Sequence, residues 1–251
     1  MFVGVLAALF LLLPVLGLVV RAPWSSIAER LTRPGVGDAI RLSALCATAS
    51  TVVALFLGVP LGWILAHGRF PGRGLLRAVV LVPLMLPPLV SGVGLFSILG
   101  RRGAIGRLLY DWSGLALPFS TAGVVVAVSF VALPFVVITM ESGFRSVDPR
   151  LASAAATLGA TPGVVARTII LPLITPTLFA GAALAWARSL GEFGATVTFA
   201  GNLPGRTQTL PLATFLALET DLDQAVLLSM LLLFPTLIVL GLLRNRFQPT
   251  L

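Results

Sequence analysis

The chain has 251 residues, of which 57% are hydrophobic and only 10% are charged. A soluble domain carries roughly 25% charged residues, so 17 basic and nine acidic side chains are too few to cover a water-facing surface. A disordered chain is also excluded, because disorder requires low hydrophobicity and a high density of charge. The composition therefore predicts an integral membrane protein.

Every basic residue is an arginine, and the chain contains no lysine. A Walker A phosphate-binding loop requires its lysine, so the chain is not itself a P-loop ATPase. Cys46 and His67 are the only residues of their kinds and lie in apolar runs, which argues against a metal centre. We therefore expect no resident cofactor and no enzymatic activity. The arginines form short clusters between apolar runs, which favours membrane lipid over nucleic acid as their partner.

Six segments are long and apolar enough to cross a membrane as helices, which takes about 20 residues each. They comprise residues 2–20, 40–66, 75–99, 121–140, 173–199 and 225–243. These runs are rich in leucine and do not alternate with polar residues, so they favour an all-α bundle over a β-barrel. The first run lacks the basic flank and the cleavage site of a signal peptide, and we keep it as a span. We expect one transmembrane domain over 1–251.

The third span contains several prolines, including the adjacent pair Pro87 and Pro88. Proline removes a helical hydrogen bond and bends or breaks the helix, and neighbouring helices can satisfy the freed groups. Two interpretations stay open for this pair. It is either a static kink or a break that moves or lines a pathway.

The arginines do not fix the orientation of the spans. Loops one, three and five hold eight arginines, and loops two and four together with the C-terminus also hold eight, so the positive-inside rule gives a tie. The first set is Arg21, Arg30, Arg33, Arg41, Arg101, Arg102, Arg107 and Arg206. The second set is Arg69, Arg73, Arg77, Arg145, Arg150, Arg167, Arg244 and Arg246. Orientation has to come from another feature.

The connection between the fourth and fifth spans, residues 143–172, has helical signals of its own. Asp148 is a good N-cap, the proline after it suits a first helical position, and Gly159 is placed to end the helix. A second short helix is predicted to begin at Pro162 and to end before Pro172. Such a compact knob suits the groove of a partner, and an amphipathic helix lying on the lipid is the alternative.

This connection resembles the signature loop of ATP-binding-cassette (ABC) importer permeases, in which Glu-Ala-Ala is followed by three residues, Gly, nine residues and Ile-x-Leu-Pro. The matching residues are Ala154, Ala155, Gly159, Ile169, Leu171 and Pro172. Ser153 stands where the family has glutamate, so the glutamate's contact is not carried over. The resemblance implies a type I ABC importer permease fold, with this loop in the cytoplasm and docked into a cleft of the ATPase subunit.

Three further stretches resemble the permeases of the molybdate, sulfate and tungstate group. They are residues 99–112, 187–196 and 202–211. The middle stretch is shared across the group, whereas the first and third fit molybdate better than sulfate. The resemblance therefore implies import of molybdate by alternating access, with sulfate and tungstate as alternatives. A secondary transporter or channel, and a membrane anchor, remain the alternatives of another class.

The resemblance also implies the partners of the chain. A second copy of the chain would complete the pathway, and two ABC ATPase subunits would bind ATP and Mg. An extracytoplasmic molybdate-binding protein would deliver the anion. The expected location is a bacterial or archaeal cytoplasmic membrane, crossed several times, with both termini in the cytoplasm.

Arg188 and Glu192 are ionisable residues within the fifth span, far from either of its predicted ends. Such residues are costly in a membrane and by default indicate a functional site. Four residues apart on one helix face, they are expected to pair. Either Arg188 lines the pathway and Glu192 moderates its charge, or the pair is a structural latch. Arg101 and Arg102, in an outer loop, either steer a dianion or the binding protein, or anchor to lipid headgroups.

Overall fold

The computed structural model describes residues 1–243, in which the regular structure consists of helices. The helices are α1 (Phe2–Arg21), α2 (Ile27–Leu31), α3 (Val36–His67), α4 (Arg73–Met85), α5 (Pro88–Leu99), α6 (Ala104–Ser113), α7 (Thr121–Ser146), α8 (Pro149–Thr157), α9 (Pro162–Val165), the π-helical turn η1 (Ala166–Ile170), α10 (Leu171–Leu190), α11 (Gly194–Phe199), α12 (Leu210–Thr220) and α13 (Leu222–Leu243). Arg244 and Arg246, which enter the arginine tie, lie outside the described residues.

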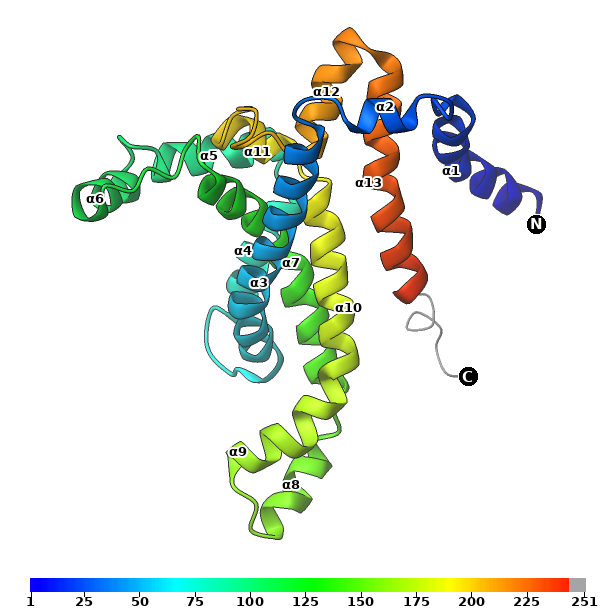
Figure 1. Ribbon diagram of the computed structural model, residues 1–251. Helices are drawn as coiled ribbons and strands as arrows, with labels where there is room; N and C mark the ends of the chain where they lie inside the picture. Colours follow the sequence, from blue (N-terminus) through cyan, green and yellow to red (C-terminus); the bar gives the residue numbers. More distant parts are fainter. Residues whose placement is uncertain (244–251) are drawn as a thin grey trace.

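The expected number of membrane spans is confirmed. Within the described residues five helices are long and apolar enough to cross a membrane: α1, α3, α7, the continuous stretch Pro162–Leu190, and α13. A sixth span is counted if α4 and α5 are taken together, although these two helices are bent by 114°. The chain is therefore a multi-pass, all-α membrane protein (Figure 1).

Helices α3, α7 and α10 pack together at the centre of the molecule (Figure 1). Their shared core contains Ala54 from α3, Val136 and Met140 from α7, and Ile174 and Ala185 from α10, all buried. Within lipid the hydrophobic effect does not drive helices together, so they associate through close packing. Small and β-branched side chains at these contacts allow the helices to approach closely. By contrast, α1 has no buried residue in this single chain.

The third span is broken at its proline pair, which is one of the two interpretations that the sequence leaves open. Helix α4 ends at Met85, and Pro87 is the residue before α5, which begins at Pro88. A proline is well suited to the first position of a helix, because its missing N–H would have no intrahelical partner there. The two prolines therefore begin a new helix rather than kink an old one. A static kink within one helix over 75–99 is therefore excluded, and the role of the break in moving or lining a pathway stays a prediction.

The predicted bounds of the fifth span are also wrong. Helix α10 ends at Leu190, because Gly191 leaves the helical conformation, and the short α11 follows as a separate helix. At the other end the backbone is helical from Pro162 onward, so the second short helix does not end before Pro172. The turn η1 restarts the hydrogen-bond register, and Pro172 falls in the first turn of α10, where proline is tolerated.

The two ends of the bundle differ in structure. Helices α8 and α9 project from one end, and α2 and α12 lie at the other (Figure 1). The 20 residues of α10 span about 30 Å between them. Features at the end of α7 and the start of α4 therefore share the α8 end, whereas the last turn of α10 lies toward the α12 end.

Candidate functional site

Arg188 and Glu192 meet at the end of α10 that is remote from α8. The Nη2 atom of Arg188 lies 2.6 Å from Oε2 of Glu192, which confirms the predicted pair. Only 2% of the Glu192 side chain is exposed, against 30% for Arg188. The expectation that both residues lie deep within one helix is wrong, since Arg188 is in the last turn of α10 and Glu192 follows the helix.

Glu192 has a second contact that ties α10 to α11. Its other carboxylate oxygen, Oε1, accepts a hydrogen bond of 2.9 Å from the N–H of Ala195 in the first turn of α11. Beside the pair, the hydroxyl of Ser50 in α3 donates to that of Ser189 over 3.0 Å. Glu192 is therefore fully engaged, whereas the Arg188 guanidinium makes no side-chain hydrogen bond to any other residue within 1–243.

The break in the third span lies against the start of α11. A Cβ atom at Gly194 would lie 2.7 Å from Cβ of Pro88, and the hydroxyl of Thr198 donates to the carbonyl of Leu89 at 3.4 Å. Gly92, one turn along α5, has the Thr198 side chain and the Ala195 backbone directly against it. The structure thus brings Pro87 and Pro88 together with the charged pair, through α11. We call residues 87–92 together with 188–198 the junction.

The connection that resembles the ABC permease signature loop, residues 143–172, lies at the opposite end of the molecule, and most of its residues are exposed. Asp148 caps α8 by accepting a hydrogen bond of 2.9 Å from the Arg150 N–H, as predicted. Gly159 ends the helical segment with φ +85°, a left-handed value. Ser153 is exposed and donates to its own helix, to the Pro149 carbonyl at 3.2 Å. The remaining motif residues are exposed or half-buried: Ala154, Ala155, Ile169, Leu171 and Pro172.

Arg101 and Arg102 lie in the turn between α5 and α6 and are not brought to the charged pair. Helix α6 lies at the edge of the molecule, away from α10 (Figure 1). The Arg101 guanidinium lies 4.0 Å from the centre of the Tyr110 ring and donates to its hydroxyl. Arg102 is exposed. Their roles stay predictions.

A second charge cluster, at the α8 end of the bundle, went unrecognised in the sequence. Glu141 of α7, 10% exposed at its side chain, contacts Arg77 of α4 and lies 2.9 Å from Nη2 of Arg145. Arg73 of α4 is 3.9 Å away. The spacing of Glu141 and Arg145 was a visible signal, whereas the arginines of α4 come from a different span.

A third cluster joins α2 to the turn between α12 and α13. Asp221 accepts hydrogen bonds from Arg33 at 2.7 Å and from Arg30 at 2.9 Å, and Arg30 also reaches Asp223 at 3.1 Å. The Arg33 hydrogen bond, then the Gln224 N–H and Arg30, hold the pKa of Asp221 well below its usual value. The carboxylate is therefore charged throughout the physiological range.

We expect Asp221→Asn to lower the thermal stability at neutral pH. Because the pKa of Asp221 is depressed in the folded state, its carboxylate contributes fully to the free energy of unfolding above the unfolded pKa of about 4. This contribution is lost as the pH falls further. The gap in midpoint between the native chain and the variant should therefore narrow below about pH 4. Thermal unfolding in detergent across this range tests it. Asp111→Asn, whose partner Arg107 is 3.6 Å away at an exposed site, should change the midpoint little. A gap independent of pH would contradict the assignment.

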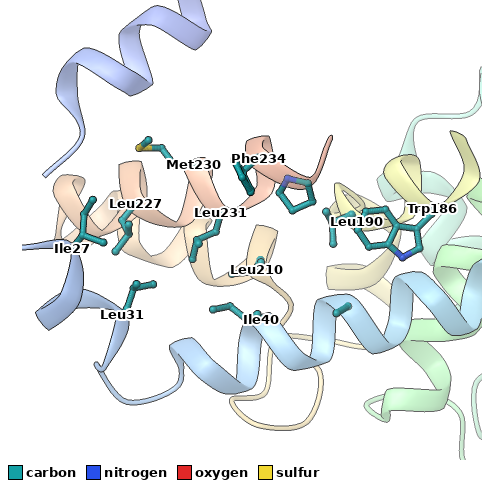
Figure 2. Close-up of a pocket in the computed structure, with 12 residues that line it drawn as sticks. Ile27, Leu31, Ile40, Trp186, Leu190, Leu210, Leu227, Met230, Leu231 and Phe234 are labelled. Atoms are coloured by element: carbon teal, nitrogen blue, oxygen red, sulfur yellow. The ribbon is translucent and has the colours of Figure 1, made fainter. Parts of the chain in front are cut away.

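One cavity beside the charged pair is an apolar groove of about 400 Å³ between α2, α3, α10 and α13 (Figure 2). Trp186 and Leu190 of α10 line it together with Met230 and Phe234 of α13. Its lining is almost entirely hydrocarbon, which suits lipid or a helix and not an inorganic anion. Within residues 1–243 no group of three or more His, Cys, Asp or Glu residues is placed to hold a metal ion.

Comparison with solved structures identifies the fold. A bacterial ABC transporter that imports the polysaccharide alginate has a chain matching with a TM-score of 0.75 at 15% identity, over 98% of this chain and 96% of that one. The MetNI methionine ABC transporter matches with a TM-score of 0.63 at 16% identity, over 83% and 92%. The fold is that of a type I ABC importer permease, as expected.

A family model described as binding-protein-dependent transport system inner membrane component matches residues 58–251. The chain belongs to this family. It is 45% identical over 233 residues to the molybdenum transport system permease protein ModB of Mycobacterium tuberculosis, covering 92% of this chain and 88% of the relative. ModB of Escherichia coli K12 is 43% identical over 73% of this chain and 80% of its own. The sulfate permease CysT of Salmonella typhimurium is 35% identical, over 95% and 88%.

Proposed function

We propose that the chain is the membrane-spanning subunit of an ATP-driven importer of molybdate. The observation that carries this is the identity of 45% to a molybdenum permease over 92% of the chain, against 35% to a sulfate permease. Sulfate and tungstate, which are also tetrahedral dianions, are the second candidates. The junction supports transport of an anion, because interrupted helices within a membrane typically border a substrate pathway.

The junction offers such an ion one cationic group that has unused hydrogen-bond donors. Arg188 is 30% exposed and paired through one terminal nitrogen only, so its remaining N–H groups are available to a tetrahedral oxyanion. Glu192 partly neutralises this charge, which would let the anion leave as well as bind. In the competing role, the pair is a latch that holds α10 to α11 and touches no substrate.

We infer the partners from the family and from the exposed loop. A second copy of this chain would complete the pathway, and two ABC ATPase subunits would bind ATP and Mg and hydrolyse the ATP. One neighbouring structure contains a periplasmic protein bound to an alginate pentasaccharide, and a molybdate-binding protein would take that place here. Docking of the ATPase on α8 and α9 would put that end, and both termini, in the cytoplasm. Arg101 and Arg102, on the opposite face, would steer the anion or the binding protein.

Uptake of radioactive molybdate tests the function directly. In host cells that lack the chain, uptake should return when the chain is supplied on a plasmid. Unlabelled molybdate should compete best, and sulfate should compete least. Equal competition by sulfate would favour the sulfate assignment, and uptake independent of the chain would contradict import altogether.

Arg188→Gln is expected to reduce uptake about tenfold or more at unchanged membrane abundance, because a charge-assisted hydrogen bond contributes roughly 1.5–3 kcal/mol. Arg107→Gln, at an exposed ion pair, is the matched control and should import normally. The double variant R188Q/E192Q separates the two roles. A pathway arginine leaves the double variant defective, whereas a latch predicts that removing both charges restores uptake. Normal uptake by Arg188→Gln would rule out the pathway role.

A further inference from the structure

Three guanidinium groups share one carboxylate at the α8 end of the bundle. Arg73 and Arg77 lie in the first turns of α4, and Arg145 lies in the last turn of α7. Arg77 and Arg145 both contact Oε1 of Glu141, and Arg73 is 3.9 Å from the same atom. Three positive charges around one negative charge leave an excess of two. This cluster shares no residue with the junction.

The excess charge is accessible and is reinforced by the backbone. The side chains of Arg73, Arg77 and Arg145 are 32%, 46% and 46% exposed, against 10% for Glu141. All their contacts to Glu141, and those of Arg73 and Arg145 to the Leu65 carbonyl, use the Nη2 atom, so other guanidinium N–H groups remain available. Helix α4 has no acidic residue in its first turn, so the positive pole of its dipole adds to the charge.

The surroundings place these guanidinium groups at the hydrocarbon boundary rather than in open water. They lie where α3 ends and α4 begins, and the aromatic residues Trp63, near the end of α3, and Phe70, in the connection to α4, are 50% and 39% exposed. Exposed aromatic side chains at helix ends are typical of the headgroup level of a membrane. Leu75 and Val79 of α4, 70% and 56% exposed, extend from the same level into the apolar zone. A lipid phosphate occupies this depth, whereas a free ion stays in the water phase.

We propose that Arg73, Arg77 and Arg145 bind the phosphate headgroup of an anionic phospholipid, with Glu141 holding the three guanidinium groups together. A basic pocket between transmembrane helices is a known form of lipid headgroup site. The proposal needs only that the chain spans a membrane and is independent of the ion imported. Lipid bound here would join α4 to α7 at the end where the loop of α8 and α9 leaves the bundle.

The test is the lipid preference of the full chain in phosphatidylcholine bilayers. Electron paramagnetic resonance compares the association of spin-labelled phosphatidylglycerol with that of spin-labelled phosphatidylcholine. The double variant R73Q/R77Q should lose most of the phosphatidylglycerol preference, about fivefold for each arginine removed. Arg145 still pairs with Glu141 in this variant, so no buried carboxylate is left alone. The matched control is R150Q/R167Q, which removes two exposed arginines from the α8–α10 segment at the same end of the chain and should keep the preference.

Three results would overturn the proposal. The first is that R73Q/R77Q keeps the preference for phosphatidylglycerol. The second is that the control R150Q/R167Q loses as much of this preference as R73Q/R77Q, which would indicate a response to net charge alone. The third is that inorganic phosphate, added to lipid-depleted protein in detergent, raises the unfolding temperature of the native chain but not that of R73Q/R77Q. This result would assign the cluster to a free anion. If R73Q/R77Q is too unstable to reconstitute, Arg73→Gln alone should show about half the loss on a logarithmic scale.

Discussion

Replacing Gly92 with valine is expected to prevent the chain from reaching its folded state in the membrane. A Cβ atom at this position would overlap the Thr198 side chain and would lie 2.7 Å from the Ala195 carbonyl oxygen. Backbone cannot yield as a flexible side chain can, so we expect a loss of about 3 kcal/mol or more. The yield of monodisperse protein after detergent extraction, and its unfolding midpoint, measure the effect.

Gly94→Val provides the control for this substitution. Gly94 is two residues away in the same helix, and a Cβ atom there would meet nothing within 4 Å. Both variants replace a glycine of α5 with the same β-branched residue, so a difference between them reports the α5–α11 contact alone. Equal yields and midpoints for the two variants would show that α5 does not pack on α11 as described.

Gly159→Val is expected to weaken capture of the ATPase while leaving membrane insertion intact, and this prediction rests on the proposed function. Gly159 has φ +85°, which a β-branched residue adopts only at a cost of about 1–2 kcal/mol. The chain would relieve the strain by changing the angle between α8 and α9. Strain of this size corresponds to a loss of about 5–30-fold in affinity for a partner that needs the native angle. Co-purification with the ATPase, and ATP hydrolysis by the complex, are the measurements.

Two further variants make the test specific. Gly163 lies in α9, where a Cβ atom would meet nothing within 4 Å and φ is not positive. The Gly163→Val variant should therefore still bind the ATPase. Gly159→Asn should recover part of the capture, because asparagine tolerates the left-handed region better than other residues with a Cβ. If Gly163→Val disrupted capture as strongly as Gly159→Val, the effect would stem from added bulk on the loop and not from the turn.

The features that depend on a few neighbouring residues were predictable from the sequence. Span number follows from run length and hydropathy, and the described helices agree with it. The cap at Asp148 and the turn at Gly159 follow from local backbone chemistry, and both are present. Pro87 and Pro88 indicated that the helix is disturbed but left a kink and a break open, and the angle of 114° was not predictable because the packing of α5 on α11 sets it.

The features that depend on other helices were not predictable. The predicted fifth span continues from Leu190 to Phe199, but Glu192 accepts the Ala195 N–H and α5 packs against α11, which makes the helix end at Gly191. Glu141 lies one residue beyond the predicted fourth span, and its arginine partners in α4 become neighbours only after α4 packs on α7. Long-range pairing of this kind leaves no period in a single sequence.

The continuous helix from Pro162 to Leu190 has a mechanical consequence. Its 29 residues extend over about 43 Å, with the exposed loop at one end and Arg188 at the other. A tilt of about ten degrees around one end would carry the other sideways by about 7 Å, which exceeds one helical turn in length. Arg188 would therefore be displaced much farther than the residues of α9, which lie near the pivot of the tilt. A rigid helix can transmit a movement between its two ends in this way without a series of small side-chain rearrangements along it.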